Sequence, residues 1–274
     1  MMAEGKGQKA IIITGAAGGL GRAIVEACLN AFPECIVLAT DVHEGVANVF
    51  SSDRILTYHL DVTDESSILS VKDKLEKNGI KIWGLVNNAG VSDFFPVSEE
   101  EKDKLEKIFA INTFGPVNMV RCFLPDLIEN KGRVVQISSE SVRLPAAFHP
   151  YAASKIAQEA LSVSLRNELA LKDVRLSIIR PGAINTPFLE DLMAMKERIG
   201  NGIYKEYLEK FSDKAPTQIH NITTPDKVAK VVLEALTSKR PKRYYRVNNN
   251  PKLRIAALLP HSVRDFFMRK MLTK

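Results

Sequence analysis

The chain has 274 residues and a net charge of +6, and its 45% hydrophobic and 26% charged residues are ordinary for one large globular domain. It contains neither a run of about 18 uncharged apolar residues that would span a membrane nor an N-terminal apolar stretch of signal-peptide length. Cys28, Cys35 and Cys122 form neither a CxxC pair nor an even disulfide set, so we expect a soluble, cytoplasmic protein with no disulfide framework and no metal site.

The first predicted strand, Ala10–Thr14, leads directly into a glycine-rich loop. The loop reads Thr14-Gly15-Ala16-Ala17-Gly18-Gly19-Leu20-Gly21, and a helical pattern follows over Leu20–Asn30. Glycines let the backbone turn sharply and approach a pyrophosphate closely, and the positive dipole end of the new helix favours phosphates. Such a loop alone could be a plain turn, but its place between a strand and a helix predicts a dinucleotide site.

The second predicted strand, Cys35–Thr40, is followed by Asp41, twenty residues after Gly21. A carboxylate at this point can accept hydrogen bonds from both hydroxyls of the adenosine ribose and would repel a 2′-phosphate. Only Arg22 lies nearby to favour that phosphate. We therefore expect NAD rather than NADP, with a simple turn residue as the alternative role for Asp41.

The remaining chain alternates apolar runs that predict strands with patterns that predict helices. The strands are expected at Ile55–Leu60, Ile82–Asn87, Arg133–Ser138 and Val174–Arg180, and the helices at Glu65–Asn78, Glu99–Leu124, Tyr151–Lys172 and Pro225–Ser238. This alternation predicts parallel strands joined by right-handed crossovers. The expected fold class is α/β, a doubly wound parallel sheet with helices on both faces.

Tyr151 and Lys155 lie four residues apart at the start of a predicted helix, so both side chains share one helix face. A free tyrosine has a pKa of about 10 and is a poor acid/base at neutral pH. A fixed ammonium nearby would stabilise the phenolate and lower that pKa. The pair can serve as a tuned proton donor, although the spacing alone is common in proteins.

After Pro181 the regular pattern is lost over residues 182–216, which are rich in Met, Leu and charged residues. Irregular segments of this length in a compact domain are often active-site lids. We therefore expect residues 182–216 to form a lid within a single domain that spans residues 1–250.

Six further motifs accompany the tyrosine and lysine in a fixed order. They are the loop 14–21, Asp61-Val62, Asn87-Asn88-Ala89-Gly90, Asn112, Ile137-Ser138-Ser139 and Pro181-Gly182-Ala183-Ile184-Asn185-Thr186. With this set the chain closely resembles the short-chain dehydrogenase/reductase family over roughly residues 8–240. The resemblance implies an NAD-dependent oxidoreductase with a Rossmann-type, seven-stranded parallel sheet, usually assembled as a homodimer or homotetramer.

The resemblance also implies a role for each matching residue. Tyr151 would be the acid/base, Lys155 would modify its pKa and bind the nicotinamide ribose, Ser139 would hold the substrate oxygen, and Asn112 would support a water that relays protons. Cofactor contacts are implied for Thr14, Gly15, Gly19, Leu20, Gly21, Asp41, Asp61, Val62, Asn88, Ala89, Gly90, Tyr151, Lys155, Pro181, Gly182, Ile184 and Thr186. Hydride would pass between the carbinol carbon and the nicotinamide while Tyr151 takes or returns the hydroxyl proton.

Two positions depart from the family pattern. Many relatives place the serine thirteen residues before the tyrosine, which would select Ser138, whereas the second serine of the motif is Ser139. Strand alternation favours Ser139, because it fixes which side chain faces the cleft. Val142 stands where a glycine is often found, so we expect a reshaped substrate wall.

The C-terminal extension, residues 251–274, belongs to a strongly basic region. Residues 239–274 contain eleven Lys or Arg and one acid, Asp265, so this region carries about +10 and the rest of the chain about −4. Apolar and basic residues mix around Pro260 as in one or two amphipathic helices. The extension is similar to that of relatives that act on retinoids and steroids, which implies a lipophilic alcohol or ketone as substrate. The tail would cover the pocket or contact an anionic membrane surface, with packing against a neighbouring subunit as the alternative.

Other functions remain open at this point. One is a non-catalytic NAD-binding sensor or scaffold, which the presence of all four candidate catalytic residues disfavours. Another is a dehydrogenase of a small polar hydroxy acid or sugar. Nucleic-acid binding is not expected, since only the basic tail suggests it, and the chain has neither interleaved aromatic residues in a sheet nor a recognition-helix motif.

Overall fold

The computed structural model describes residues 8–143, 147–186, 199–218 and 222–273. Its centre is a sheet of seven parallel strands in the order β3-β2-β1-β4-β5-β6-β7, which confirms the predicted α/β class. In open sheets of this kind, ligands bind at the carboxyl ends of the strands where the strand order reverses, here between β1 and β4. The strands are β1 Gln8–Thr14, β2 Ile36–Asp41, β3 Ile55–His59, β4 Ile80–Asn87, β5 Arg133–Ile137, β6 Arg175–Pro181 and β7 Tyr244–Val247.

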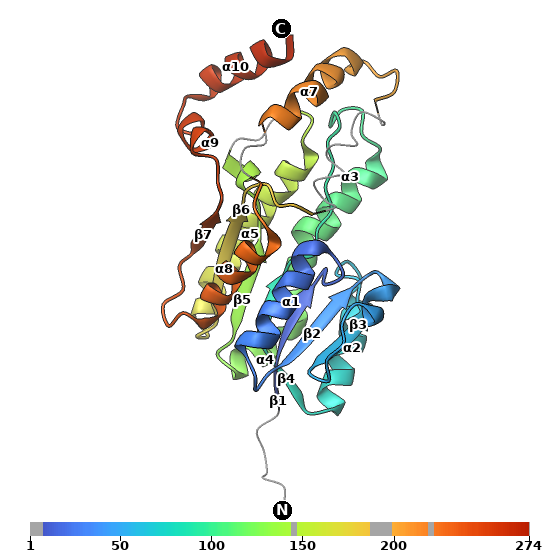
Figure 1. Ribbon diagram of the computed structural model, residues 1–274, viewed down its shortest axis with the longest axis vertical. Helices are drawn as coiled ribbons and strands as arrows, with labels where there is room; N and C mark the ends of the chain where they lie inside the picture. The colour runs from blue at the N-terminus through green and yellow to red at the C-terminus, as the bar shows by residue number, and fades with distance from the viewer. Residues whose placement is uncertain (1–7, 144–146, 187–198, 219–221, 274) are drawn as a thin grey trace, which may run out of the picture.

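Helices cover both faces of the sheet (Figure 1). One face packs against α1 Gly19–Ala31 and α8 Pro225–Thr237, and the other against α2 Glu65–Lys77, α4 Gly115–Glu129 and α5 Pro150–Ala170. In β1, Ile11 and Ile13 face the first layer while Ala10 and Ile12 face the second, and all four are fully buried. Burial on both faces explains why this strand is a continuous apolar run.

The single helix predicted over residues 99–124 is wrong in its bounds and in its continuity. The structure has α3 Lys102–Phe109, then a π-helical turn Ala110–Phe114, and then α4, which continues to Glu129. Within the turn, Thr113 donates a hydrogen bond to the backbone carbonyl of Ser154 in α5 at 2.9 Å. The extra residue of a π-helical turn directs this side chain and Asn112 inward, and apolar periodicity does not reveal such a turn.

Strand β7 was not among the segments predicted from the hydrophobic pattern. It has four residues, lies at the edge of the sheet, and pairs with β6 so that Arg246 stands opposite Arg180. A short edge strand that carries an exposed arginine has no apolar run long enough to mark it.

The C-terminal extension forms two helices, α9 Pro251–Ala256 and α10 His261–Thr273, on either side of Pro260. In the predicted lid, residues 187–198 lie outside the described residues, and the end of the segment belongs to α7 Lys205–Gln218. Figure 1 shows α7, α9 and α10 at the same end of the molecule. Leu272 of α10 packs against a cluster formed by Phe148, Leu208 and Phe211. The tail therefore folds back onto the domain through α7. Two short 3₁₀ helices, η1 Glu44–Asn48 and η3 Glu140–Arg143, complete the elements described here.

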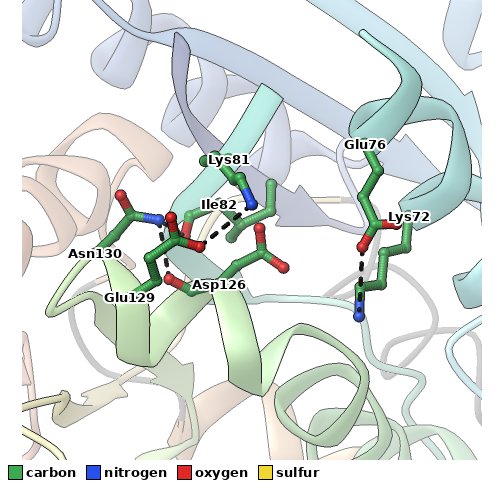
Figure 2. Close-up of polar contacts among 7 residues, drawn as sticks. All are labelled: Lys72, Glu76, Lys81, Ile82, Asp126, Glu129 and Asn130. Atoms are coloured by element: carbon green, nitrogen blue, oxygen red, sulfur yellow. Dashed lines mark hydrogen bonds and ion pairs between the residues drawn. The ribbon is translucent and has the colours of Figure 1, made fainter. Parts of the chain in front are cut away.

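The start of β4 and the end of α4 are joined by polar contacts, shown in Figure 2. Lys81 forms an ion pair with Glu129 at 3.2 Å, and the Asn130 side chain donates a hydrogen bond to the carbonyl of Ile82 at 3.3 Å. Both charged side chains are well exposed, so the pair contributes at most about 1 kcal/mol to stability. These contacts fix the end of α4 to the sheet, at the end of β4 opposite to the predicted motifs.

Within the described ranges, no helix has the length and hydropathy needed to cross a bilayer. The same residues contain no cluster of three or more His, Cys, Asp or Glu side chains that could hold a metal ion. All three cysteines are free; Cys28 and Cys122 are buried, and Cys35 is partly buried. Burial raises the pKa of the Cys28 thiol to about 12, so this thiol is inert at neutral pH.

Candidate active site

The glycine-rich loop folds tightly onto the first turn of α1. Gly15 has a positive φ of 66°, and a Cβ added at Gly21 would lie 2.1 Å from the carbonyl oxygen of Gly15. No side chain caps the start of α1, because the N-cap residue is Gly18. This arrangement leaves a cradle without side chains at a positive helix end, which fits the pyrophosphate of a dinucleotide.

Thr14 ties this loop to the end of β4. Its hydroxyl accepts hydrogen bonds from the backbone N–H groups of Asn88 at 3.1 Å and Ala89 at 3.0 Å, and Asn88 in turn donates to the carbonyls of Thr14 and Gly15. Thr14 is only 1% exposed and does not line the cavity. Its hydroxyl positions the ends of the two strands at the reversal point, and its predicted cofactor contact stays a prediction.

Asp41 stands at the end of β2, beside the glycine-rich loop. Its carboxylate accepts hydrogen bonds from the backbone N–H groups of Ala17 at 2.8 Å and His43 at 2.9 Å. The Ala17 bond holds the carboxylate against the cradle. Arg22, the residue that would favour a 2′-phosphate, donates its Nε–H to the carbonyl of Ala17.

One cavity of about 1270 Å³ brings most of the predicted site residues together. Two predicted site residues, Thr14 and Asn112, are buried and do not line this cavity. The predicted residues that line it are Gly15, Gly19, Leu20, Gly21, Asp41, Asp61, Val62, Asn88, Ala89, Gly90, Ser139, Tyr151, Lys155, Pro181, Gly182, Ile184 and Thr186.

Tyr151 and Lys155 occupy the first turns of α5 and are 9% and 3% exposed. The Lys155 Nζ donates a hydrogen bond to the carbonyl of Ile137 at 2.9 Å and lies 5.8 Å from the centre of the Tyr151 ring. The Tyr151 hydroxyl is hydrogen-bonded to the side chain of Ser139. Three of the four predicted catalytic side chains thus meet at one point of the cavity wall.

The pKa of Tyr151 differs from the expectation. Burial raises the pKa of Tyr151 to about 12, and the hydrogen bond with Ser139 only partly opposes this. Burial also lowers the pKa of Lys155 to about 8, against the effect of the nearby Glu159 carboxylate. The predicted lowering of the tyrosine pKa is therefore not found, because desolvation is the largest influence on this group.

The two candidate serines have different surroundings. Ser138 is 3% exposed, and its hydroxyl donates a hydrogen bond to the Glu159 carboxylate. Ser139 faces Tyr151, and its oxygen accepts hydrogen bonds from the N–H and the hydroxyl of Ser141 at 3.2 and 3.0 Å. The geometry favours Ser139 as the group that holds a substrate oxygen, as predicted.

Asn112 is fully buried in the π-helical turn. Its side-chain oxygen accepts a hydrogen bond from the N–H of Val91, and its amide donates to the carbonyl of Val91 and to the hydroxyl of Ser154, each at 2.9 Å. The side chain therefore braces the segment after β4 against α5. Its role in a water-mediated proton relay stays a prediction.

The wall beside Tyr151 consists of aromatic residues that the motifs did not identify. The His149 ring stacks on Phe94 with centroids 3.9 Å apart and lies 5.7 Å from the Tyr151 ring, and Phe211 of α7 packs on Phe94. Burial lowers the pKa of His149 to about 3, so the ring is neutral at physiological pH. Because these residues come from three distant segments, no local pattern could have grouped them.

The C-terminal helices contribute to the same cavity. Leu253 and Ala256 of α9, Leu259 in the connection, and Phe267 and Met268 of α10 line it together with the catalytic residues. The tail is therefore part of the pocket wall, and its covering role stays a prediction.

The sequence matches a model of the short chain dehydrogenase family over residues 9–197. The chain belongs to this family. As a short-chain dehydrogenase it is an oxidoreductase of alcohols or ketones that uses a nicotinamide dinucleotide.

Two named relatives of this short-chain dehydrogenase act on different substrates. It is 32% identical to retinol dehydrogenase 5 of Mus musculus, with 93% of this chain and 86% of the relative covered. It is 30% identical to the mitochondrial D-beta-hydroxybutyrate dehydrogenase of Bos taurus, with 87% and 76% covered. Among solved structures, a short-chain dehydrogenase of Streptomyces avermitilis has a TM-score of 0.74 at 27% identity, covering 99% of this chain and 96% of that one.

Substitution of the two serines tests their assignment. We expect Ser139→Ala to lower kcat/KM by about 100-fold or more, because the substrate oxygen loses a hydrogen-bond donor in the transition state. Ser138→Ala, which removes a bond to Glu159 only, should retain most of the turnover. Steady-state kinetics followed by NADH absorbance measures both, and a larger loss for Ser138→Ala than for Ser139→Ala would reverse the assignment.

Proposed function

We propose that this short-chain dehydrogenase uses NAD(H) to interconvert a lipophilic alcohol and its ketone or aldehyde, with Tyr151 as the acid/base. The observation that carries this proposal is the hydrogen-bonded contact of Ser139 and Tyr151, with Lys155 beside it, in the same cavity as the glycine-rich cradle. This arrangement is unnecessary for a cofactor sensor or scaffold, which needs the cradle alone.

The residues of the site divide the chemistry among them. Ser139 holds the substrate oxygen, and Tyr151 takes the hydroxyl proton in oxidation or returns it in reduction. Lys155, while protonated, stabilises the tyrosinate that forms during oxidation. The aromatic wall excludes water from this point. The nicotinamide, when bound in the cradle, supplies the hydride acceptor or donor.

The character of the wall supports a lipophilic substrate. Phe94, the neutral His149 and Phe211 stand next to Tyr151, and the tail adds Leu259 and Met268. Retinol, for which one relative is named, would fit such an apolar wall better than hydroxybutyrate, for which the other relative is named. Arg264 and Asp265 of α10 also line the cavity, so its lining includes charges of both signs. A panel of retinoids, steroids, hydroxy acids and sugars would distinguish these classes directly.

The outer surface of the tail supports a contact with an anionic membrane. Ile255, Leu258 and Phe266 are 65%, 85% and 62% exposed, and basic residues flank them on both helices. Exposed apolar groups can enter the lipid interface while basic groups near it contribute on the order of 1 kcal/mol each. We therefore propose that the protein is peripheral at a membrane surface. From the sequence expectations we also propose that it is cytoplasmic and that its subunits form a homodimer or homotetramer.

Removal of the tyrosine hydroxyl tests the reaction itself. Tyr151→Phe should abolish nearly all turnover and leave the NADH dissociation constant within a few-fold, because the hydroxyl transfers a proton and contributes little to binding. Lys155→Met should impair both. Turnover is measured with the best substrate of the panel, and NADH binding by fluorescence titration. Substantial turnover of Tyr151→Phe would contradict the proposal.

Cofactor preference tests the role of Asp41. We expect kcat/KM for NAD(H) to exceed that for NADP(H) by at least about tenfold, since a carboxylate that faces a 2′-phosphate costs more than about 1.4 kcal/mol. Asp41→Ala should narrow the difference, whereas Asp53→Ala, at an exposed position near the start of β3, serves as the matched control. Equal values for both cofactors in the unaltered chain would refute the preference.

The tail has two separable tests. A chain truncated after Asn250 should lose most of its kcat/KM on a lipophilic substrate, because α9 and α10 form part of the wall. In a liposome flotation experiment, only the full chain should float, and only with anionic vesicles. Full activity of the truncated chain would exclude a covering role, and equal recovery from neutral and anionic vesicles for both chains would exclude the membrane contact.

A further inference from the structure

Glu159 is a buried acid one helical turn beyond Lys155 in α5, and it is 7% exposed. One of its carboxylate oxygens accepts hydrogen bonds from the Ser138 hydroxyl and from Arg180 Nε, the latter at 2.8 Å. The other oxygen accepts a hydrogen bond from the second arm of the Arg180 guanidinium. Both oxygens are therefore held by groups at the carboxyl ends of β5 and β6.

The charges around Glu159 are predominantly positive. Lys155 lies on the same helix, Arg180 comes from β6, and Arg143 of η3 is close enough to interact electrostatically with it. Arg246 of β7 stands opposite Arg180 in the sheet. The acid of η3, Glu140, is engaged elsewhere. Its carboxylate accepts a hydrogen bond from the backbone N–H of Asn250, at the start of the C-terminal extension.

The effect of each charge on Lys155 has a definite sign. Burial lowers the pKa of Lys155 to about 8, and the negative charge of Glu159 opposes that decrease. Arg180 has the opposite influence, because its positive charge offsets that of Glu159. A lysine whose pKa lies this close to neutrality responds to either change within the range of pH where enzymes are assayed.

We propose that Glu159 is a positioning residue that keeps the Lys155 ammonium charged beside Tyr151, and that Arg180 limits the strength of this effect. Ser138 and Arg180 hold the carboxylate in place one helical turn from the lysine. The inference deepens the proposed function, since it rests on the role given there to Lys155. None of the motifs in the sequence marks Glu159 or Arg180 for such a role.

The direct test measures the titration of Lys155 in the full chain. Lysines labelled with ¹³C at the ε position are followed by NMR against pH, and Lys155→Met identifies the signal of Lys155. Glu159→Gln should lower the pKa of Lys155 by about one unit, because Arg180 is then an uncompensated cation nearby. Arg180→Met should raise it, since Glu159 then acts alone. The double variant should give an intermediate value.

The two single variants distinguish this role from a structural one. Loss of either partner of a buried ion pair destabilises the fold, so both variants should lower Tm, but only an electrostatic role moves the lysine pKa in opposite directions. The alkaline limb of kcat/KM for oxidation, where the ammonium is lost, should move to lower pH in Glu159→Gln and to higher pH in Arg180→Met. If one single variant does not fold, comparison of the double variant with the other single variant still gives the sign of the effect of the second charge.

Glu129→Gln is the matched control, because it removes the carboxylate of an ion pair at the opposite end of β4 (Figure 2). It should leave the Lys155 titration unchanged. Shifts of the same sign in the two single variants, a shift below about 0.3 unit in both, or a double variant outside the range that they define would overturn the inference. The titration needs no turnover, so its failure is distinguishable from failure of the proposed function, which Tyr151→Phe reports.

Discussion

The hydrogen bonds that the Thr14 hydroxyl accepts from Asn88 and Ala89 join the two strands between which the strand order reverses. Parallel strands all end at the same edge of a sheet, so the loops that follow them collect there, and a gap opens where neighbouring crossovers run to opposite faces. Thr14 fixes how far apart the ends of β1 and β4 lie at this gap. The glycine-rich cradle begins directly after Thr14, and Asn88 donates to its first carbonyls, which explains why a residue that does not line the cavity can be essential to its shape.

The site also contains buried charge that the fold must compensate. Lys155 lines the cavity, Glu159 and Arg180 pair beside it, and an unpaired charge in such a position would cost several kcal/mol. Glu159 pairs directly with Arg180, and the carbonyl of Ile137 accepts a hydrogen bond from Lys155 that partly replaces its lost hydration. The same low-dielectric surroundings that make pairing necessary raise the pKa of Tyr151, so stability and acid/base chemistry have one physical origin.

The sheet and the cofactor cradle were predictable because their signals are local. Strands buried on both faces are continuous apolar runs, as in Ala10–Thr14, and the glycines of the first loop are consecutive in the chain. The π-helical turn at Ala110–Phe114 and the short edge strand β7 were not predictable, because neither has a periodicity of its own. The direction of the Tyr151 pKa was wrong, since spacing indicates which charges are near but not how completely water is excluded.

The residues around the substrate part of the cavity show more generally what could not be predicted from the sequence. His149, Phe94 and Phe211 come together only through the tertiary fold, and each alone is an ordinary aromatic residue. The pairing of Arg180 with Glu159 joins residues 21 positions apart in different elements. The two serines at 138 and 139 are the intermediate case: alternation continued past the end of β5 predicts opposite sides for them, and the structure supplies their partners.

The π-helical turn has a consequence for how the length of this chain can vary. Each residue of an α-helix advances the direction of its side chain by about 100°, so deletion of one residue within Ala110–Phe114 would restore regular α-helical hydrogen bonding and rotate α3 relative to α4 by about that angle. The two helices are held by different neighbours, α4 by the sheet and α3 by α5. A deletion that improves the local geometry would therefore turn Asn112 away from Val91 and Ser154. Insertions and deletions in this family member are better tolerated in its surface loops than in the middle of this apparently uniform helical stretch.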